Sequence, residues 1–218
     1  MYNLLFDYDG TLHDCLHIYA PAVRAVYSRM ARQGLVPERP LPDTEIRSWI
    51  GLTPDEMWGL LAPDLPAAEK EAAGAQVGAH MLQQVRAGRA RLYPGVHGAL
   101  AALRADGFRL LLLSNCPADY LQAHAACFGL GRYFEGLYCG AQFGYRPKHE
   151  IFSALRKRYP GPFAVIGDRR QDMEIALRHG LPAVGCLYGY GGPGELAGAD
   201  LTVTAPGQLP DCLRQLAG

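Results

Sequence analysis

Short apolar segments alternate with helical segments over the second half of this chain, from residue 95 to its end. Glycine, proline or polar residues bound the apolar segments, whereas the segments between them carry apolar residues at helical spacing. This alternation is typical of an α/β domain whose mostly parallel sheet is covered by helices on both faces. We expect strands at residues 108–113, 136–139, 163–166, 182–187 and 200–203, and helices at 95–106, 117–129, 148–158, 169–179 and 207–216.

The first strand of this domain is separated from the rest by a long insertion. Residues 3–6, Asn-Leu-Leu-Phe, are predicted to form a buried strand that ends at a glycine turn. From about residue 14 to 90 the pattern is helical, and prolines divide it into helices at 14–33, 42–50, 54–62 and 66–88. We therefore expect an α/β core domain at 1–13 and 91–218, interrupted by a small α-helical domain at 14–90.

Charge and hydropathy exclude some classes of function. The chain has 218 residues, with 21 Lys and Arg against 21 Asp and Glu, so it lacks the basic excess of a nucleic-acid-binding surface. The longest uninterrupted aliphatic stretch, residues 110–113, is far shorter than the roughly 20 residues of a membrane-spanning helix. No basic segment precedes the first apolar residues, as an export signal requires. We expect a cytoplasmic protein that binds neither nucleic acid nor membrane.

Polar side chains follow three of the predicted strands: Asp7 and Asp9 after the first, Ser114 and Asn115 after the second, and Asp168 after the fourth. Ligands of open parallel sheets bind beyond the carboxyl ends of the strands, so we expect these side chains to converge on one crevice. Several carboxylates at close range repel one another and need a cation. Because the donors are oxygens without His or Cys, the sequence predicts Mg²⁺ together with a substrate phosphate.

Two aspartates separated by one residue can divide the work of a reaction. In an extended segment Asp7 and Asp9 point the same way, which suits one as nucleophile and the other as proton carrier. Taken singly, each has a plainer interpretation as a turn former or helix N-cap. The scarcity of lysine supports a role for Lys148, because only three of the 21 basic residues are Lys. A compact ammonium suits a phosphoryl oxygen better than a planar guanidinium does.

Four short motifs follow one another at these strand ends. They are Asp-Tyr-Asp-Gly-Thr-Leu at residues 7–12, Ser114-Asn115, Lys148 in Arg-Pro-Lys-His-Glu-Ile-Phe, and Gly167-Asp168-Arg-Arg-Gln-Asp172. In this order and strand context they resemble the four motifs of the haloacid dehalogenase-like superfamily, and the resemblance covers nearly the whole chain. It implies a Rossmann-like doubly wound core with an inserted helical cap, as in the small-cap subfamily that includes phosphoglycolate phosphatases.

The resemblance also implies a mechanism. Asp7 would attack the phosphorus of a phosphomonoester and form an aspartyl-phosphate, and Asp9 would protonate the leaving alcohol and later activate water. The Asp7 carboxylate, the Asp9 backbone carbonyl and Asp168 would hold Mg²⁺. The remaining implied roles are phosphate binding by Ser114, Asn115, Thr11 and Lys148, charge neutralisation by Lys148, and positioning of Lys148 or a metal-bound water by Asp172.

Several functions share these motifs. The leading hypothesis is a Mg²⁺-dependent phosphatase that acts on a small phosphorylated metabolite. The alternatives are a phosphomutase resembling β-phosphoglucomutase, a 2-haloacid dehalogenase, and a phosphate-binding module that has lost catalysis. Related dehalogenases lack a carboxylate two residues after the nucleophile, so Asp9 favours phosphoryl transfer. A non-catalytic module would be expected to lose Asp7, Asp9 or Lys148, and all three are present.

The inserted helical domain is expected to set the substrate. Residues 51–53, Gly-Leu-Thr, resemble the specificity loop of small-capped relatives, and Arg47 is a candidate ligand for a carboxylate or second phosphate. Trp49 and Trp58 recur at a spacing that favours a core role over substrate stacking. Oligomeric state leaves no signal in the sequence.

Two patterns imitate other sites. Residues 189–194 satisfy GxGxxG, but they lie near the end of the chain and contain Pro193, so we expect a flexible loop rather than a dinucleotide site. His13 and His17 have the spacing of the HExxH zinc motif without its Glu or a third ligand. One of the two histidines is expected to face the crevice, because they lie just beyond Asp7.

Overall fold

The computed structural model of the chain describes residues 1–52, 54–192 and 194–217. The chain divides into two compact units, one of residues 1–14 and 91–218 and one of residues 15–90. We call these the α/β unit and the helical unit. Within the described residues, no helix combines the length and the apolarity that a membrane crossing requires.

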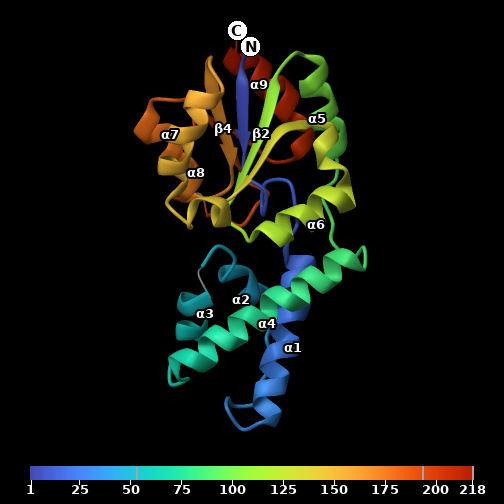
Figure 1. Ribbon diagram of the computed structural model, residues 1–218, viewed down its shortest axis with the longest axis vertical. Helices are drawn as coiled ribbons and strands as arrows, with labels where there is room; N and C mark the ends of the chain where they lie inside the picture. Colours follow the sequence, from blue (N-terminus) through green and yellow to red (C-terminus); the bar gives the residue numbers. More distant parts are fainter. Residues whose placement is uncertain (53, 193, 218) are drawn as a thin grey trace. The chain divides into compact units, whose positions relative to one another are not determined.

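In its described residues the α/β unit contains a six-stranded sheet with the order β3-β2-β1-β4-β5-β6, and every neighbouring pair of strands is parallel (Figure 1). This order confirms the predicted doubly wound α/β fold. The strands are β1 (Asn3–Phe6), β2 (Arg109–Ser114), β3 (Phe134–Cys139), β4 (Phe163–Gly167), β5 (Ala183–Cys186) and β6 (Leu201–Val203).

Helices cover both faces of the sheet, as the continuous burial of β1 and β4 requires. Helices α7 and α8 lie on one face, and α5 and α9 on the other (Figure 1). Leu5 of β1, Phe152 of α7 and Ile175 of α8 belong to the same buried cluster. The helices of the unit are α5 (Val96–Ala105), α6 (Ala118–Phe128), α7 (Lys148–Arg158), α8 (Arg170–His179) and α9 (Leu209–Ala217), with short 3₁₀ helices at Leu130–Arg132, Gly140–Phe143 and Pro206–Gln208.

The helical unit contains α1 (Leu16–Arg32), α2 (Asp43–Ser48), α3 (Pro54–Leu61) and α4 (Ala67–Arg86). Its apolar side chains form their own core, in which Val23 of α1 and Val77 of α4 are buried. Trp49 and Trp58 belong to this core and are 5% and 0% exposed, which confirms the predicted core role of both.

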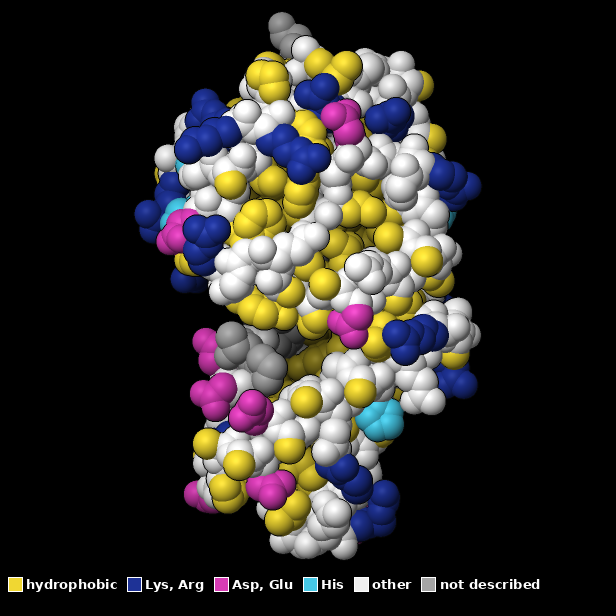
Figure 2. Space-filling model, viewed as in Figure 1, with side chains coloured by type: hydrophobic (Ala, Val, Ile, Leu, Met, Phe, Trp, Pro, Cys, Tyr) yellow, Lys and Arg dark blue, Asp and Glu magenta, His cyan; other side chains and the backbone are white. Residues whose placement is uncertain are grey.

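The surface carries both signs of charge, as the zero net charge of the sequence requires. On the face of the α/β unit that Figure 2 shows, Lys and Arg side chains occupy several separate places, with Asp and Glu side chains between some of them.

The order of strands fixes where a site can form. Strands β2 and β3 lie on one side of β1, and β4, β5 and β6 lie on the other, so the chain reverses its winding between β1 and β4. In α/β sheets of this kind, ligands bind at the carboxyl ends of the strands at this switch point. Asp7 follows β1 there, its backbone N–H donating to the carbonyl of Ile166 in β4 at 2.8 Å, and Asp168 follows β4.

Candidate active site

A tight turn follows Asp7 and brings the chain back on itself. The carbonyl of Tyr8 accepts from the N–H groups of Leu12 at 2.8 Å and His13 at 2.9 Å, and Gly10 donates to the carbonyl of His13 at 2.9 Å. Gly10 has φ of 90°, and a Cβ there would lie 2.2 Å from Asp168 Oδ2. Glycine is therefore required at this position by both its backbone angle and its closeness to Asp168.

Lys148 lies between two carboxylates at this edge of the sheet. Its Nζ donates to Asp7 Oδ1 at 2.6 Å and to Asp172 Oδ1 at 2.7 Å. Lys148 begins α7, and Asp172 lies in the first turn of α8, where its Oδ2 accepts from the backbone N–H of Arg169 at 3.1 Å. All three side chains are nearly buried, so these are short charge-assisted bonds in a region of low dielectric.

Asp168 completes the group of carboxylates. Its Oδ1 accepts from the Thr11 hydroxyl at 3.1 Å, and its Oδ2 accepts from the backbone N–H of Tyr190 at 2.8 Å. One oxygen from each of Asp7, Asp168 and Asp172 lies within 4.8 Å of the others. We call Asp7, Lys148, Asp168 and Asp172 the ionic cluster.

Burial and mutual repulsion perturb the acidity of the ionic cluster. Burial raises the pKa of Asp7, Lys148 lowers it and Asp168 raises it, and together these effects bring it to about 6. Burial and the neighbouring Asp172 raise the pKa of Asp168 to about 6, and burial and Asp7 do the same for Asp172. Burial lowers the pKa of Lys148, but its two carboxylate partners outweigh this and raise it, so the ammonium stays charged.

The ionic cluster fits a hard divalent cation. Its three carboxylates face the single ammonium of Lys148, so two negative charges remain unbalanced when all are ionised. Oxygen donors without nitrogen or sulfur favour Mg²⁺ over transition metals. The residues present could therefore hold the predicted Mg²⁺.

Asp9 lies in different surroundings from Asp7. Its Oδ1 accepts from His13 Nδ1 at 2.6 Å and from the Tyr120 hydroxyl at 3.0 Å. Burial raises the pKa of Asp9, but the hydrogen bond and charge of His13 outweigh it and hold the pKa below its ordinary value. The Asp9 side chain is therefore held by one donor on its own turn and one on α6.

Among the predicted site residues, the structure brings together Asp7, Thr11, Lys148, Asp168 and Asp172. Asp9, two residues after Asp7, bonds His13 and Tyr120 instead. Ser114 is buried at the end of β2, beside β1, whereas Asn115 is exposed. The Asn115 amide packs on Gly140, where a Cβ would lie 2.5 Å from Asn115 Oδ1. Phosphate binding by Ser114 and Asn115 stays a prediction.

The glycine-rich loop after β5 supports Asp168, although the sequence predicts only a flexible connection there. A Cβ at Gly189 would lie 2.3 Å from Asp168 Cβ, and one at Gly191 would lie 1.8 Å from its carbonyl oxygen. The Tyr190 hydroxyl donates to Asp14 Oδ1 at 2.6 Å. These glycines thus allow the loop to approach Asp168 closely. Pro193 lies outside the described residues.

Sequence reasoning missed the residues around Asp9. The sequence indicates His13 only as a candidate zinc ligand or a residue facing the crevice, and no pattern in it predicts a bond to Asp9. Tyr120 and His124 lie more than a hundred residues away on α6. Their separation by four residues places them on one face of that helix, and this is the one pattern that could have suggested a shared environment.

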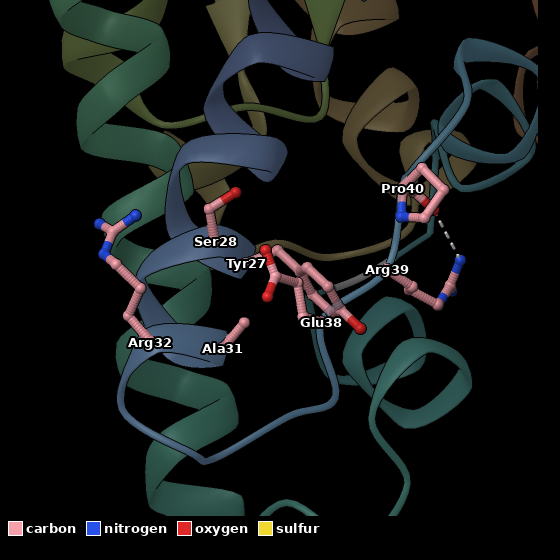
Figure 3. Close-up of a pocket in the computed structure, with 7 residues that line it drawn as sticks. All are labelled: Tyr27, Ser28, Ala31, Arg32, Glu38, Arg39 and Pro40. Carbon is pink, nitrogen blue, oxygen red and sulfur yellow. Dashed lines mark hydrogen bonds between the residues drawn. The ribbon is translucent and has the colours of Figure 1, made fainter.

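The predicted specificity residues belong to the helical unit. Arg47 lies in α2 and is exposed, and Thr53 lies outside the described residues. A hollow in this unit is lined by Tyr27, Ser28, Ala31, Arg32, Glu38, Arg39 and Pro40 (Figure 3). Two of its polar side chains bond nearby residues: Arg39 pairs with Glu45 at 2.7 Å, and the Tyr27 hydroxyl donates to the carbonyl of Pro37 at 2.8 Å. This lining gives no reason to assign a ligand.

Comparisons with known proteins agree with this fold. A family model described as haloacid dehalogenase-like hydrolase matches residues 3–180. Over 218 residues, the chain is 31% identical to the plasmid phosphoglycolate phosphatase of Cupriavidus necator, covering 96% of this chain and 92% of that protein. A solved structure from Haemophilus somnus, described as a predicted phosphoglycolate phosphatase, has a TM-score of 0.79 at 22% identity and 96% coverage of both chains. CbbY of Rhodobacter sphaeroides, solved with phosphate, has a TM-score of 0.75 at 20% identity and 95% coverage of both.

The doubly wound sheet, with buried carboxylates and a lysine at its switch point, is an α/β fold of the Rossmann-like type. The chain belongs to the haloacid dehalogenase-like hydrolase family. The predicted enzyme class, a phosphoric monoester hydrolase similar to phosphoglycolate phosphatases, is thereby confirmed.

Proposed function

We propose that this enzyme is a Mg²⁺-dependent phosphatase that hydrolyses a small phosphomonoester through an aspartyl-phosphate on Asp7. One observation carries the proposal. Asp7 lies in the ionic cluster, and a second aspartate, Asp9, follows two residues later and is held separately by other hydrogen bonds. Neither group alone would define this chemistry, because buried carboxylate–lysine clusters also occur as structural ion pairs.

The first chemical step uses both aspartates. Lys148 bonds Asp7 Oδ1, so Asp7 Oδ2 is the oxygen available to attack the phosphorus. As the new O–P bond forms, the bond from phosphorus to the leaving oxygen breaks, and a protonated Asp9 gives its proton to the departing alcohol. The products of this step are a free alcohol and an aspartyl-phosphate.

The second step returns the enzyme to its starting state. Asp9, now a carboxylate, takes a proton from a water molecule that attacks the phosphorus of the aspartyl-phosphate. The bond from phosphorus to Asp7 breaks, inorganic phosphate leaves, and Asp7 is again a carboxylate.

Charge neutralisation is the main work left to the surrounding residues, as phosphoryl transfer in general demands. Asp7, Asp168 and the Asp9 backbone carbonyl would hold Mg²⁺, which supplies positive charge to the phosphate when bound. Lys148 neutralises charge at the attacking aspartate, and Asp172 keeps Lys148 in place. Ser114, Asn115 and Thr11 are the proposed phosphate-binding residues, and Thr11 also holds Asp168.

The relatives suggest a substrate class. Curated relatives across much of the chain's length carry the name phosphoglycolate phosphatase, so a small, acidic phosphomonoester such as phosphoglycolate is the first substrate to test. Arg47 and residues 51–53 are the proposed specificity elements. A cytoplasmic location and the absence of nucleic-acid and membrane partners stay predictions.

A phosphomutase would begin with the same first step and differ only in the acceptor of the phosphoryl group. It would pass the group from Asp7 to a sugar hydroxyl instead of water. Analysis of the products formed from a sugar phosphate separates the two, because a mutase yields an isomeric sugar phosphate and a phosphatase yields inorganic phosphate.

The proposal is tested by phosphate release from phosphoglycolate and from p-nitrophenyl phosphate, with and without Mg²⁺. We expect the wild type to need Mg²⁺ and Asp7→Asn to lose at least about 10⁴-fold in kcat, because removal of a nucleophile leaves little of the catalytic pathway. Asp106→Asn is a matched control, since this aspartate pairs with the exposed Arg214 on the surface of the α/β unit. Equal phosphate release by the wild type and Asp7→Asn would refute the mechanism.

A further inference from the structure

We propose that His13 and Tyr120 are positioning residues that fix the Asp9 carboxylate for proton transfer to the leaving alcohol. The proposal rests on the proposed function, because it assigns these two residues to the step that Asp9 performs. It concerns orientation: His13 and Tyr120 hold one oxygen of Asp9 so that the other is presented to the reacting group.

Both donors bond the same oxygen. His13 Nδ1 lies 2.6 Å and the Tyr120 hydroxyl 3.0 Å from Asp9 Oδ1. Within the described part of the chain, the hydrogen bonds to the Asp9 side chain fall on Oδ1, so Oδ2 is left for the reacting group. The Asp9 side chain is 28% exposed, whereas His13 is fully buried, so the carboxylate is open to a ligand and its support is not. Two bonds from separate segments restrict rotation of the carboxylate more than one bond would.

The backbone turn is what places His13 beside Asp9. The His13 N–H donates to the carbonyl of Tyr8 at 2.9 Å, and the His13 carbonyl accepts from Gly10 at 2.9 Å. Asp9 and His13 also form a β-bridge, and a second bridge joins His13 to Leu92. The imidazole position is therefore set by the backbone of the turn that carries both aspartates.

Tyr120 reaches Asp9 from α6, and its neighbours hold its position. Tyr120 and His124 lie on one face of this helix with ring centroids 4.3 Å apart, and His124 lies 4.4 Å from the His13 ring. The Tyr8 hydroxyl and His124 Nδ1 are 2.7 Å apart. We call Tyr8, His13, Tyr120 and His124 the aromatic cluster.

Stability alone does not account for this arrangement. Among the described residues, the buried Nε2 atoms of His13 and His124 have no hydrogen-bond partner. A buried polar atom without a partner costs free energy, so an apolar side chain would pack there with less loss. What the imidazole of His13 supplies, and an apolar side chain does not, is the bond from Nδ1 to Asp9.

The dependence on the leaving group tests this role. An alkyl phosphate such as phosphoglycolate needs a proton on its departing oxygen, whereas p-nitrophenolate leaves without one. We expect His13→Leu and Tyr120→Phe each to lower kcat on the alkyl phosphate by about 10- to 100-fold, the usual effect of removing a supporting hydrogen bond. The initial burst of p-nitrophenol, which reports formation of the aspartyl-phosphate, should keep its rate. His13→Asn, which restores an N–H near the position of Nδ1, should recover part of the loss.

Two controls separate positioning from general damage. Tyr159→Phe removes another buried hydroxyl of the α/β unit, which bonds Tyr138 at 2.7 Å, and should leave both substrates unaffected. In the Asp9→Asn background, His13→Leu should cause no further loss, because a residue that acts through Asp9 has nothing left to position. A loss in the rate of the p-nitrophenol burst equal to the loss on the alkyl phosphate, or a full additional loss in the Asp9→Asn background, would overturn the proposal.

A spectroscopic measurement keeps this inference separate from the proposed function. The proton on the buried His13 Nδ1, bonded to the Asp9 carboxylate, should give a downfield ¹H–¹⁵N signal that Asp9→Asn shifts upfield. Absence of that signal in the wild type refutes the bond whatever the activity is. If the signal is present but Asp7→Asn retains full activity, the bond exists and the proposed mechanism is wrong. The positioning role of His13 and Tyr120 in that reaction is then wrong as well.

Discussion

Asp7 and Asp9 are two residues apart on one turn, yet they lie in opposite surroundings. Asp7 belongs to the ionic cluster, where burial and neighbouring carboxylates raise its pKa to about 6. Asp9 belongs with the aromatic cluster, where the hydrogen bond and charge of His13 keep its pKa low. Lys148 bonds the first, and a histidine and a tyrosine bond the second.

Because their surroundings differ, two carboxylates on one turn can have separate tasks. Groups whose environments push their pKa values apart are those to which different catalytic roles can be assigned. The surroundings of Asp7 suit binding of a cation and attack on a charged phosphate, because excess negative charge there attracts positive charge. The surroundings of Asp9 suit proton transfer, because its donors orient it without bringing another carboxylate close.

After loss of the nucleophile itself, the largest expected effect comes from removing the proton carrier while leaving its surroundings intact. Asp9→Asn keeps an oxygen that can accept from His13 and Tyr120 but cannot carry the proton. We expect kcat on phosphoglycolate to fall by about 10² to 10⁴-fold, the usual range for general acid–base catalysis. A single burst of p-nitrophenol should remain, followed by slow turnover. Loss of the burst in stopped-flow absorbance would contradict the separation of tasks.

A smaller effect is expected from changing the charge of the ionic cluster. Lys148→Met removes the ammonium that partly balances three carboxylates. We expect kcat to fall by about 10² to 10³-fold, as for loss of other groups that stabilise developing charge. Mg²⁺ should bind more tightly to the variant, since its competitor for the carboxylates is gone. Calorimetric titration of the variant with Mg²⁺ checks this. Weaker Mg²⁺ binding by the variant than by the wild type would show that Lys148 does not compete with Mg²⁺ for the carboxylates.

The smallest expected effect is on stability and lies in the aromatic cluster. Burial, aided by the charge of His13, lowers the pKa of His124 to about 3 from the ordinary 6.5. Because the folded state keeps this imidazole neutral, only the unfolded chain takes up its proton below pH 6.5. Stability therefore falls as the pH drops from about 6.5 toward 3, by up to about 1.4 kcal/mol per pH unit.

His124→Phe removes this titration. Urea unfolding should show that the variant is less stable than the wild type near pH 7 by about 1–3 kcal/mol, because Tyr8 has lost its hydrogen-bond partner. This difference in the free energy of unfolding should shrink as the pH falls. A difference that stays constant from pH 7 to pH 4 would mean that His124 is not held neutral by the fold.

Much of the fold follows from the sequence because strands and helices are local. The buried strand Phe163–Gly167 and the helix Lys148–Arg158 lie where the apolar runs and helical spacing predict them. The polar residues at strand ends predicted the meeting of Asp7 with Asp168, since parallel strands share an edge. Such predictions need only the direction of each strand.

The surroundings of Asp9 could not be predicted in this way. The Tyr120 contact depends on the rotation of α6 about its own axis, which no local pattern fixes. The approach of Gly189 to Asp168 depends on the path of a loop, and a GxGxxG pattern alone carries no information about it. Side-chain contacts between distant segments arise only when the packed elements fix their distances.

The central claim is that Asp7 carries the phosphoryl group during turnover. The most direct measurement is acid quenching of the enzyme during hydrolysis of p-nitrophenyl phosphate with Mg²⁺, followed by mass spectrometry of its peptides. The account predicts one phosphoryl group on the peptide that contains Asp7, in the wild type and to a greater extent in Asp9→Asn. A phosphoryl group on another residue, or none during turnover of Asp9→Asn, would contradict it.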